Sequence, residues 1–146
     1  MVTKFSPQPQ PHEHSDSKET AATTFVDSYY PALNSLNTRT QLASYYAPNA
    51  AIVWNGNAIT GGEDFANVFA SMPTSTYDPQ SFDAQPIGGH GDPNASTGIF
   101  LSVSGSVRYG EGKDLQTFNE TFVLQPEGPN SKKWKITVQN FRLVSD

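Results

Sequence analysis

The first third of the chain repeats apolar residues with the period of a helix. From residue 22 to residue 36 they recur at steps of three and four, which predicts one buried helix face. We expect this helix to begin near Asp16, because Asp16 stands three residues before Glu19 in a spacing typical of a capping box. Pro31 predicts a kink over Asp27–Tyr30 or a split helix, because proline removes a hydrogen bond and clashes with the preceding turn. The predicted buried residues are Ala22, Phe25, Val26, Tyr29, Leu33 and Leu36.

The next segment predicts a short helix followed by a tight hairpin. The helix is expected over Thr38–Ala47, ahead of a proline. The hairpin turn is expected at Asn55-Gly56, a dipeptide that strongly favours two-residue hairpin loops. Its strands are Ala50–Trp54 and Asn57–Ile59, and the side chain of Trp54 is expected to seat the hairpin against the core.

A third helix follows the hairpin directly. Thr60 and Glu63 have the spacing of a capping box, and Pro73 is expected to end the helix. The apolar positions fall at i, i+3, i+4 and i+7, which predicts a buried face of Phe65, Val68, Phe69 and Met72.

After residue 74 the pattern changes to the period of two that is typical of strands. Loops rich in Gly, Pro and Asn separate four predicted strands, Ser81–Ile87, Thr97–Tyr109, Asp114–Gln125 and Lys133–Val144. Helices first and hairpin-linked strands afterwards indicate an α+β domain, with three N-terminal helices packed on one face of an antiparallel sheet.

The alternation along the last two strands assigns their side chains to two faces. One face carries bulky apolar residues and is expected to meet the helices: Phe118, Phe122, Leu124, Phe141 and Leu143. The opposite face is mixed and medium-sized: Asn119, Thr121, Val123, Val138, Asn140 and Arg142. That composition suits a protein–protein contact, although antiparallel sheets also commonly leave one face in water, so the pattern alone leaves both interpretations open.

The composition is that of one globular domain with an aromatic core. The chain has 146 residues, of which 36% are hydrophobic and 12% aromatic. Residues 1–17 are rich in Pro, Gln and Ser and are expected to form a disordered tail, which leaves residues 18–146 as the domain.

Charge and residue usage exclude several classes of function. The net charge is −5 without a basic run, so direct binding of nucleic acid is not expected. There is no cysteine, and His12 and His14 alone do not make a metal site, so no metal or cofactor is expected. No apolar run is long enough for a membrane span, which places the chain in the cytosol or nucleus.

Catalysis has few candidate residues. Asp83 and Glu120 are candidate acids, and His90 lies in a glycine-rich segment that reads as a solvated loop. Glu120 shares the phenylalanine face of its strand, where burial would raise its pKa and suit it to act as a base, although exposure or an ion pair is commoner. With no nucleophile arrangement, metal-ligand cluster or phosphate loop, we expect no enzyme.

Long stretches of the chain resemble the nuclear transport factor 2-related export proteins. The resemblance is carried by "RTQLASYYAPNAAIVWNGNAITGGEDFANVFASMP" (39–73), "FDAQPI" (82–87), "GSVRYGEGKDLQTFNETFVLQP" (105–126) and "WKITVQNFRLVSD" (134–146). It covers nearly the whole chain after residue 18, and the loops rich in Pro, Ser and Gln are more typical of a fungal member.

The resemblance implies a nuclear transport factor 2-like cone, with a curved antiparallel sheet. It also implies that the chain is the small subunit of the heterodimeric mRNA export receptor and pairs with the large subunit of that receptor. That heterodimer contacts phenylalanine–glycine nucleoporins and shuttles between nucleus, nuclear pore complex and cytoplasm. In the family, the arginine of the terminal "FR" strand, here Arg142, pairs with an acidic residue of the partner. The residues expected to flank it are Val138, Asn140, Thr121 and Ser102.

Two rival functions remain open. One is the homodimeric carrier that imports the GTPase Ran, which shares "RTQL" and "FRL" but presents an acidic rim to its cargo, whereas the loop "RYGEGKD" is of mixed sign. The other is an isomerase or dehydratase of the same cone-shaped fold, because fold alone does not decide function.

Overall fold

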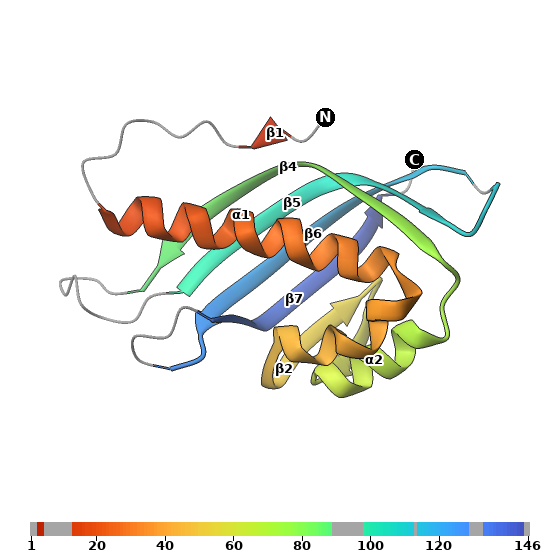
Figure 1. Cartoon of the computed structure of the whole chain (residues 1–146), viewed down its shortest axis with the longest axis horizontal. Coiled ribbons are helices and arrows are strands. Elements are labelled where there is room, and N and C mark those ends of the chain that lie inside the picture. The colour runs from red at the N-terminus through yellow and green to blue at the C-terminus, as the bar shows by residue number, and fades with distance from the viewer. Residues whose placement is uncertain (1–2, 5–12, 89–97, 113, 129–132, 145–146) are drawn as a thin grey trace.

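A computed structural model describes residues 3–4, 13–88, 98–112, 114–128 and 133–144. The long helix α1 (Glu13–Asn34) lies across one face of a curved sheet, and the 3₁₀ helix η1 (Leu36–Tyr45) and helix α2 (Gly62–Ala70) pack together at one end (Figure 1). The strands are β1 (Thr3–Lys4), β2 (Tyr46–Trp54), β3 (Asn57–Thr60), β4 (Ser75–Ile87), β5 (Gly98–Tyr109), β6 (Gln116–Pro126) and β7 (Trp134–Val144). The expected α+β class, with three helices on a curved sheet, is confirmed.

The sheet has the strand order β1-β4-β5-β6-β7-β2-β3. Strands β4 to β7 form an antiparallel meander, and β2 and β3 form an antiparallel hairpin. A wholly antiparallel sheet was expected, and that prediction is wrong. Strand β2 runs parallel to β7, and β1 runs parallel to β4. The hairpin attaches beside the last strand of the meander, so no tight turn dictates the relative direction of β2 and β7.

Helix α1 differs from its prediction at both ends. It begins at Glu13, ahead of the predicted start at Asp16, and it continues past Pro31 without a split. Pro31 lies in the last turn on the exposed side, and the carbonyl that its missing N–H would have bonded belongs to Asp27, which is also exposed and can bond water. Leu36 was predicted to be buried but is 56% exposed, because the chain has already passed into η1.

Two strands begin earlier than predicted, each before a proline. Strand β2 begins at Tyr46 rather than Ala50, and its pairing with β7 shifts register between Tyr46 and Ala51, where Pro48 is accommodated. The predicted helix over Thr38–Ala47 is therefore the 3₁₀ helix η1. Strand β4 begins at Ser75, and its pairing with β5 is irregular next to Pro79. In both strands an irregular pairing accommodates a residue that cannot donate a backbone hydrogen bond.

The start of α2 also differs from the prediction. Thr60 ends β3 and does not cap the helix; the N-cap residue is Gly61, whose φ of 85° is readily adopted only by glycine. The predicted capping box is therefore wrong. Phe65 and Phe69 are buried as expected, whereas Val68 is exposed.

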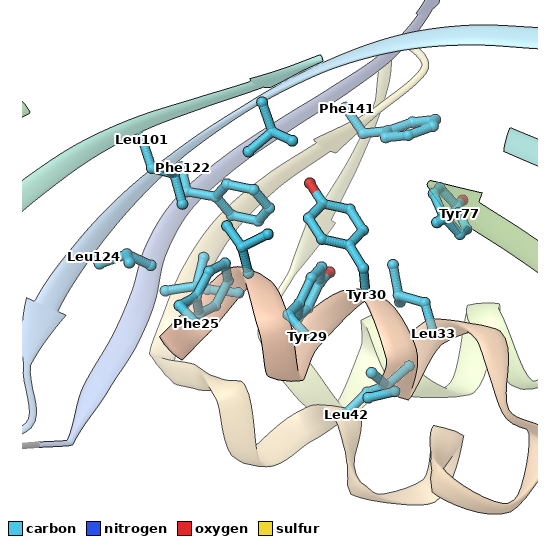
Figure 2. Packing of buried hydrophobic residues seen from close by; sticks show 14 of the residues in the cluster. Phe25, Tyr29, Tyr30, Leu33, Leu42, Tyr77, Leu101, Phe122, Leu124 and Phe141 are labelled. Atoms are coloured by element: carbon cyan, nitrogen blue, oxygen red, sulfur yellow. The ribbon is translucent and has the colours of Figure 1, made fainter. Parts of the chain in front are cut away.

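The core is a layer of aromatic side chains between α1 and the sheet. In Figure 2 the rings of Phe25, Tyr29 and Tyr30 project from α1 toward the side chains of β5, β6 and β7. Trp54 is 7% exposed, and its ring stacks on that of Phe141 with 4.0 Å between centroids. The prediction that Trp54 seats the hairpin against the core is confirmed.

Buried Arg39 ties the ends of the two main helices together, a role that the sequence pattern did not indicate. Its guanidinium donates to the carbonyl oxygens of Leu33, Phe69, Met72 and Pro73 and to the hydroxyl of Ser75. Leu33 and Phe69 lie in the last turns of α1 and α2, and Met72 and Pro73 follow α2 within three residues. Arg39 therefore supplies donors where the helices end and few backbone N–H groups remain to pair the carbonyls. All five guanidinium N–H groups are thereby used, which offsets the cost of burying the charge.

We predict that Trp54→Ala lowers the free energy of unfolding by ~3–5 kcal/mol, the usual cost of truncating a buried aromatic residue. Denaturant titration of purified protein measures this value. Val53→Ala is the control, because the neighbouring Val53 faces outward and is 38% exposed, so its truncation should cost far less. Equal effects of the two substitutions would show that Trp54 is not part of the core.

Candidate functional site

The inner and outer faces of β6 and β7 are those predicted from the alternation. Phe118, Phe122, Leu124 and Phe141 are buried beneath the helices, and Leu143 is half-buried. The intervening residues point to the opposite face of the sheet, which in the part of the chain that the structure describes carries no helix.

The structure brings all five predicted site residues together on that outer face. Ser102, Thr121 and Asn140 are direct partners across β5, β6 and β7, so their side chains form one row. Val138 lies two residues along β7 on one side of this row, and Arg142 lies two residues along on the other.

The same face exposes a group of large apolar side chains. Val138 is 46% exposed, Phe100 is 39% exposed and Val53 is 38% exposed. Val53 is paired with Asn140, and the strand register runs from Phe100 through Val123 to Val138, so these side chains belong to neighbouring rows. We call the following residues the outer patch: Val53, Phe100, Ser102, Thr121, Val123, Val138, Asn140 and Arg142.

Phe100 and Val53 were missed by the sequence analysis. The run Ile99-Phe100-Leu101 is apolar on both faces of its strand, and this was the available signal for Phe100. Contiguous exposed apolar side chains with a polar surround are typical of interaction surfaces. The outer patch is thus neither a core nor an ordinary solvated face.

Arg142 is exposed and forms no ion pair with any residue in the described ranges. Asn55 of the hairpin turn forms hydrogen bonds with the backbone of the residues directly before and after Arg142. The Asn55 backbone N–H donates to the Phe141 carbonyl at 2.9 Å, and the Leu143 N–H donates to Asn55 Oδ1 at 2.9 Å. The Asn-Gly turn therefore has a second role beyond closing the hairpin: it positions the backbone on either side of Arg142.

The opposite, inner face of the same strands holds a buried polar network. The Tyr30 hydroxyl donates to Glu120 Oε1 at 2.7 Å, and Gln139 Nε2 donates to Glu120 Oε2 at 2.6 Å. The Gln139 amide also contacts two further tyrosines: its Nε2 donates to the Tyr29 hydroxyl at 2.9 Å, and its Oε1 accepts from the Tyr46 hydroxyl at 2.7 Å. The polar side chains of the network are thus hydrogen-bonded to one another, as buried polar groups normally are.

Burial raises the pKa of Glu120 to about 8, although its hydrogen bonds from Gln139 and Tyr30 act in the opposite direction. The commoner alternatives considered for the Glu120 carboxylate were exposure to solvent and an ion pair. Both are wrong, because the carboxylate is buried and its partners are the uncharged side chains of Tyr30 and Gln139. Glu120 is 1% exposed and both its oxygens contact protein groups, so a substrate has no access to it in this conformation. Asp83 lies exposed on the outer side of β4, and His90 lies outside the described residues.

Within the described ranges, no three His, Cys, Asp or Glu side chains gather as ligands for a metal ion. The helices of the described part of the chain include none with the length and apolar character needed to span a bilayer.

Comparison with known proteins decides the family. The sequence model of the nuclear transport factor 2 (NTF2) domain matches residues 21–143. The chain belongs to the NTF2 domain family. It is 32% identical over 123 residues to NTF2-related export protein 1 of Bos taurus, covering 84% of this chain and 85% of that protein. It is also 30% identical over 128 residues to nuclear transport factor 2 of Emericella nidulans, covering 86% of this chain and 94% of that protein.

Solved structures agree on the NTF2-like fold. The chain matches a chain in the crystal structure of the Candida albicans Mtr2–Mex67 M domain complex with a TM-score of 0.71 and 16% identity, covering 88% of this chain and 97% of the other. At that identity the similarity establishes the fold. The curated relatives named above carry the names of export and transport proteins, not of enzymes.

We predict a specific dependence of stability on pH from the buried carboxyl of this NTF2 domain. The pKa of Glu120 is about 8 in the folded protein against an ordinary value of 4.5. The unfolded chain therefore releases this proton at lower pH than the folded chain does. The contribution of Glu120 to stability is fully present below about pH 4.5 and is lost progressively as the pH rises to about 8.

Denaturant titrations of the native protein and of Glu120→Gln across this range measure the effect. The native protein should lose about 4 kcal/mol more than the variant between the two limits, since each tenfold change in proton affinity corresponds to about 1.4 kcal/mol. The buried tyrosines of the network do not contribute to this pH dependence, because burial raises the pKa of the phenols of Tyr29, Tyr30 and Tyr46 above its usual value. If the free energy of unfolding changes with pH in the same way for the native protein and for the Glu120→Gln variant, the raised pKa of Glu120 is refuted.

Proposed function

We propose that this chain is the non-catalytic small subunit of a heterodimer, whose partner is the NTF2-like domain of the large subunit of the mRNA export receptor. The observation that carries the proposal is the outer patch, where apolar side chains and uncharged polar side chains surround one arginine. Such a mixture matches the core of a protein–protein interface, in which charged residues other than arginine are depleted.

Arg142 supplies the specificity of this interface. It points from a rigid strand whose backbone is held by Asn55. A guanidinium offers a planar fork of donors that fits a carboxylate, and a partner with an acidic residue at this point completes the pair. A partner without that residue would leave the arginine buried and unpaired, which costs several kcal/mol and discriminates between partners.

The relatives support this role. The curated relative from Bos taurus is named as an export protein, and the structural neighbour Mtr2 was solved in complex with the Mex67 M domain. By analogy, the heterodimer formed by this chain contacts phenylalanine–glycine nucleoporins and carries mRNA through the nuclear pore, and the subunit shuttles between nucleus and cytoplasm.

A homodimeric import carrier is the second candidate, because nuclear transport factor 2 of Emericella nidulans is also similar. In a symmetric dimer the same patch must supply both members of each contact. The outer patch itself contains no acidic residue, but Asp83 flanks it on the same face, where it pairs with Ser102 on the β4 side, three strands away from β7. A homodimer through this face would have to bring Arg142 of each copy to Asp83 of the other, whereas a different chain can place an acidic residue directly opposite Arg142.

We predict that Arg142→Asp abolishes the heterodimer while the domain remains folded. Loss of one member of a buried ion pair costs ~3–5 kcal/mol, which raises the dissociation constant more than a hundredfold. Isothermal titration with the purified NTF2-like domain of the large subunit measures the affinity, and circular dichroism checks the fold.

Lys18→Asp is the matched control, because it changes the charge equally but lies on α1, on the other side of the sheet. It should bind the partner as the native protein does. Undiminished affinity of the Arg142→Asp variant would contradict the proposal.

A further inference from the structure

A shallow open groove runs between strand β3 and helix α2, apart from the outer patch. Its lining residues come from these two elements: Ala58, Ile59, Thr60, Asp64, Asn67 and Val68. Strand β3 is the last strand of the sheet, so the groove lies along a free sheet edge. Neither the buried network nor the outer patch uses any of these residues.

The backbone of β3 presents unpaired hydrogen-bonding groups to this groove. The two-residue turn makes Trp54 and Asn57 the first pair of the β2–β3 hairpin, and Ile52 pairs with Ile59 two residues further along. The N–H and C=O groups of the intervening residues, Ala58 and Thr60, therefore point away from β2. None of these groups has a hydrogen-bond partner among the described residues. Such an edge is a template for an added strand.

The other wall of the groove is one face of α2. Asp64, Asn67 and Val68 are spaced at i, i+3 and i+4, so their side chains lie together. Val68 is 46% exposed, whereas Phe65 and Phe69 of the same helix are buried in the core. Glu63 and Asp64 are both exposed in the first turn, and neither forms an ion pair within the described ranges.

Together these features specify the chemistry of an occupant. We infer that the groove binds an extended peptide segment of a partner protein, which adds a strand to β3 through the backbone groups of Ala58 and Thr60. An apolar side chain of the segment covers Ile59 and Val68, and a neighbouring lysine or arginine lies beside Asp64. In strand addition the backbone bonds supply affinity, while pockets for alternate side chains supply selectivity.

The test uses the full chain and a defined probe, the acetylated and amidated octapeptide TVKFTVKT, which alternates apolar and polar residues and carries two lysines. Titration of ¹⁵N-labelled protein, followed by amide chemical shifts, should show saturable shifts at Ala58, Thr60 and Val68. The same peptide with N-methylated Phe and Val should bind about tenfold more weakly or worse, because it cannot complete the added strand. Replacement of its lysines by glutamate should also weaken binding.

Two variants of the chain distinguish binding of the peptide in the groove from non-specific binding elsewhere on the surface. Ala58→Pro removes an outward-facing N–H, a change that an edge strand tolerates, and it should weaken binding about tenfold without lowering the melting temperature by more than a few degrees. Val68→Glu places a charge on an already exposed position, so it should weaken binding of the peptide while the fold stays intact. This variant tests the inference even if Ala58→Pro prevents folding. Val138→Asp on the outer patch is the control and should bind the probe normally.

Several outcomes would overturn the inference. They are no saturable shift at millimolar probe, shifts centred on the outer patch, or equal binding by the native protein and the Val68→Glu variant. Concentration-dependent self-association that Ala58→Pro abolishes would assign the edge to a second copy of the chain instead. Because Val138→Asp affects only the outer patch, failure of the heterodimer proposal and failure of this inference are distinguishable.

Discussion

The structure depends on the hydrogen bonds that Glu120 and Gln139 make inside the domain. These two side chains lie on adjacent strands, contact each other at 2.6 Å, and bond tyrosines of α1 and β2. A slip of one residue in either strand would turn its whole inner set outward. Apolar residues alone resist such a slip, but a buried carboxyl and amide make it costlier, because their partners would be left unsatisfied.

This constraint has a consequence on the other side of the sheet. Glu120 lies between Asn119 and Thr121, and Gln139 lies between Val138 and Asn140. Holding the inner residues therefore fixes which side chains form the outer patch and how they are spaced. The Asn55 turn adds a second restraint from the hairpin side, next to Arg142. The outer patch is thus preorganised, and a partner that binds it has little backbone ordering to impose.

The sequence predicted the features that follow from periodicity. The inner and outer faces of β6 and β7, the hairpin at Asn55 and the existence of three helices all come from local patterns with a clear period. The starts of β2 and β4 were missed because Pro48 and Pro79 normally argue against a strand, whereas irregular pairing accommodates both. Arg39 and the tyrosine partners of Glu120 were missed for a different reason. Their contacts join residues far apart in the chain, and no local pattern encodes such contacts.

The central claim is that another NTF2-like domain covers the outer patch. Hydroxyl-radical footprinting of the chain, alone and in an equimolar mixture with the NTF2-like domain of the large export subunit, tests it most directly. The account predicts strong protection of Val53, Phe100 and Val138 in the mixture and unchanged oxidation of Leu36, which is exposed on the helical side. Oxidation of the three patch residues at the same rate with and without the second domain would contradict it.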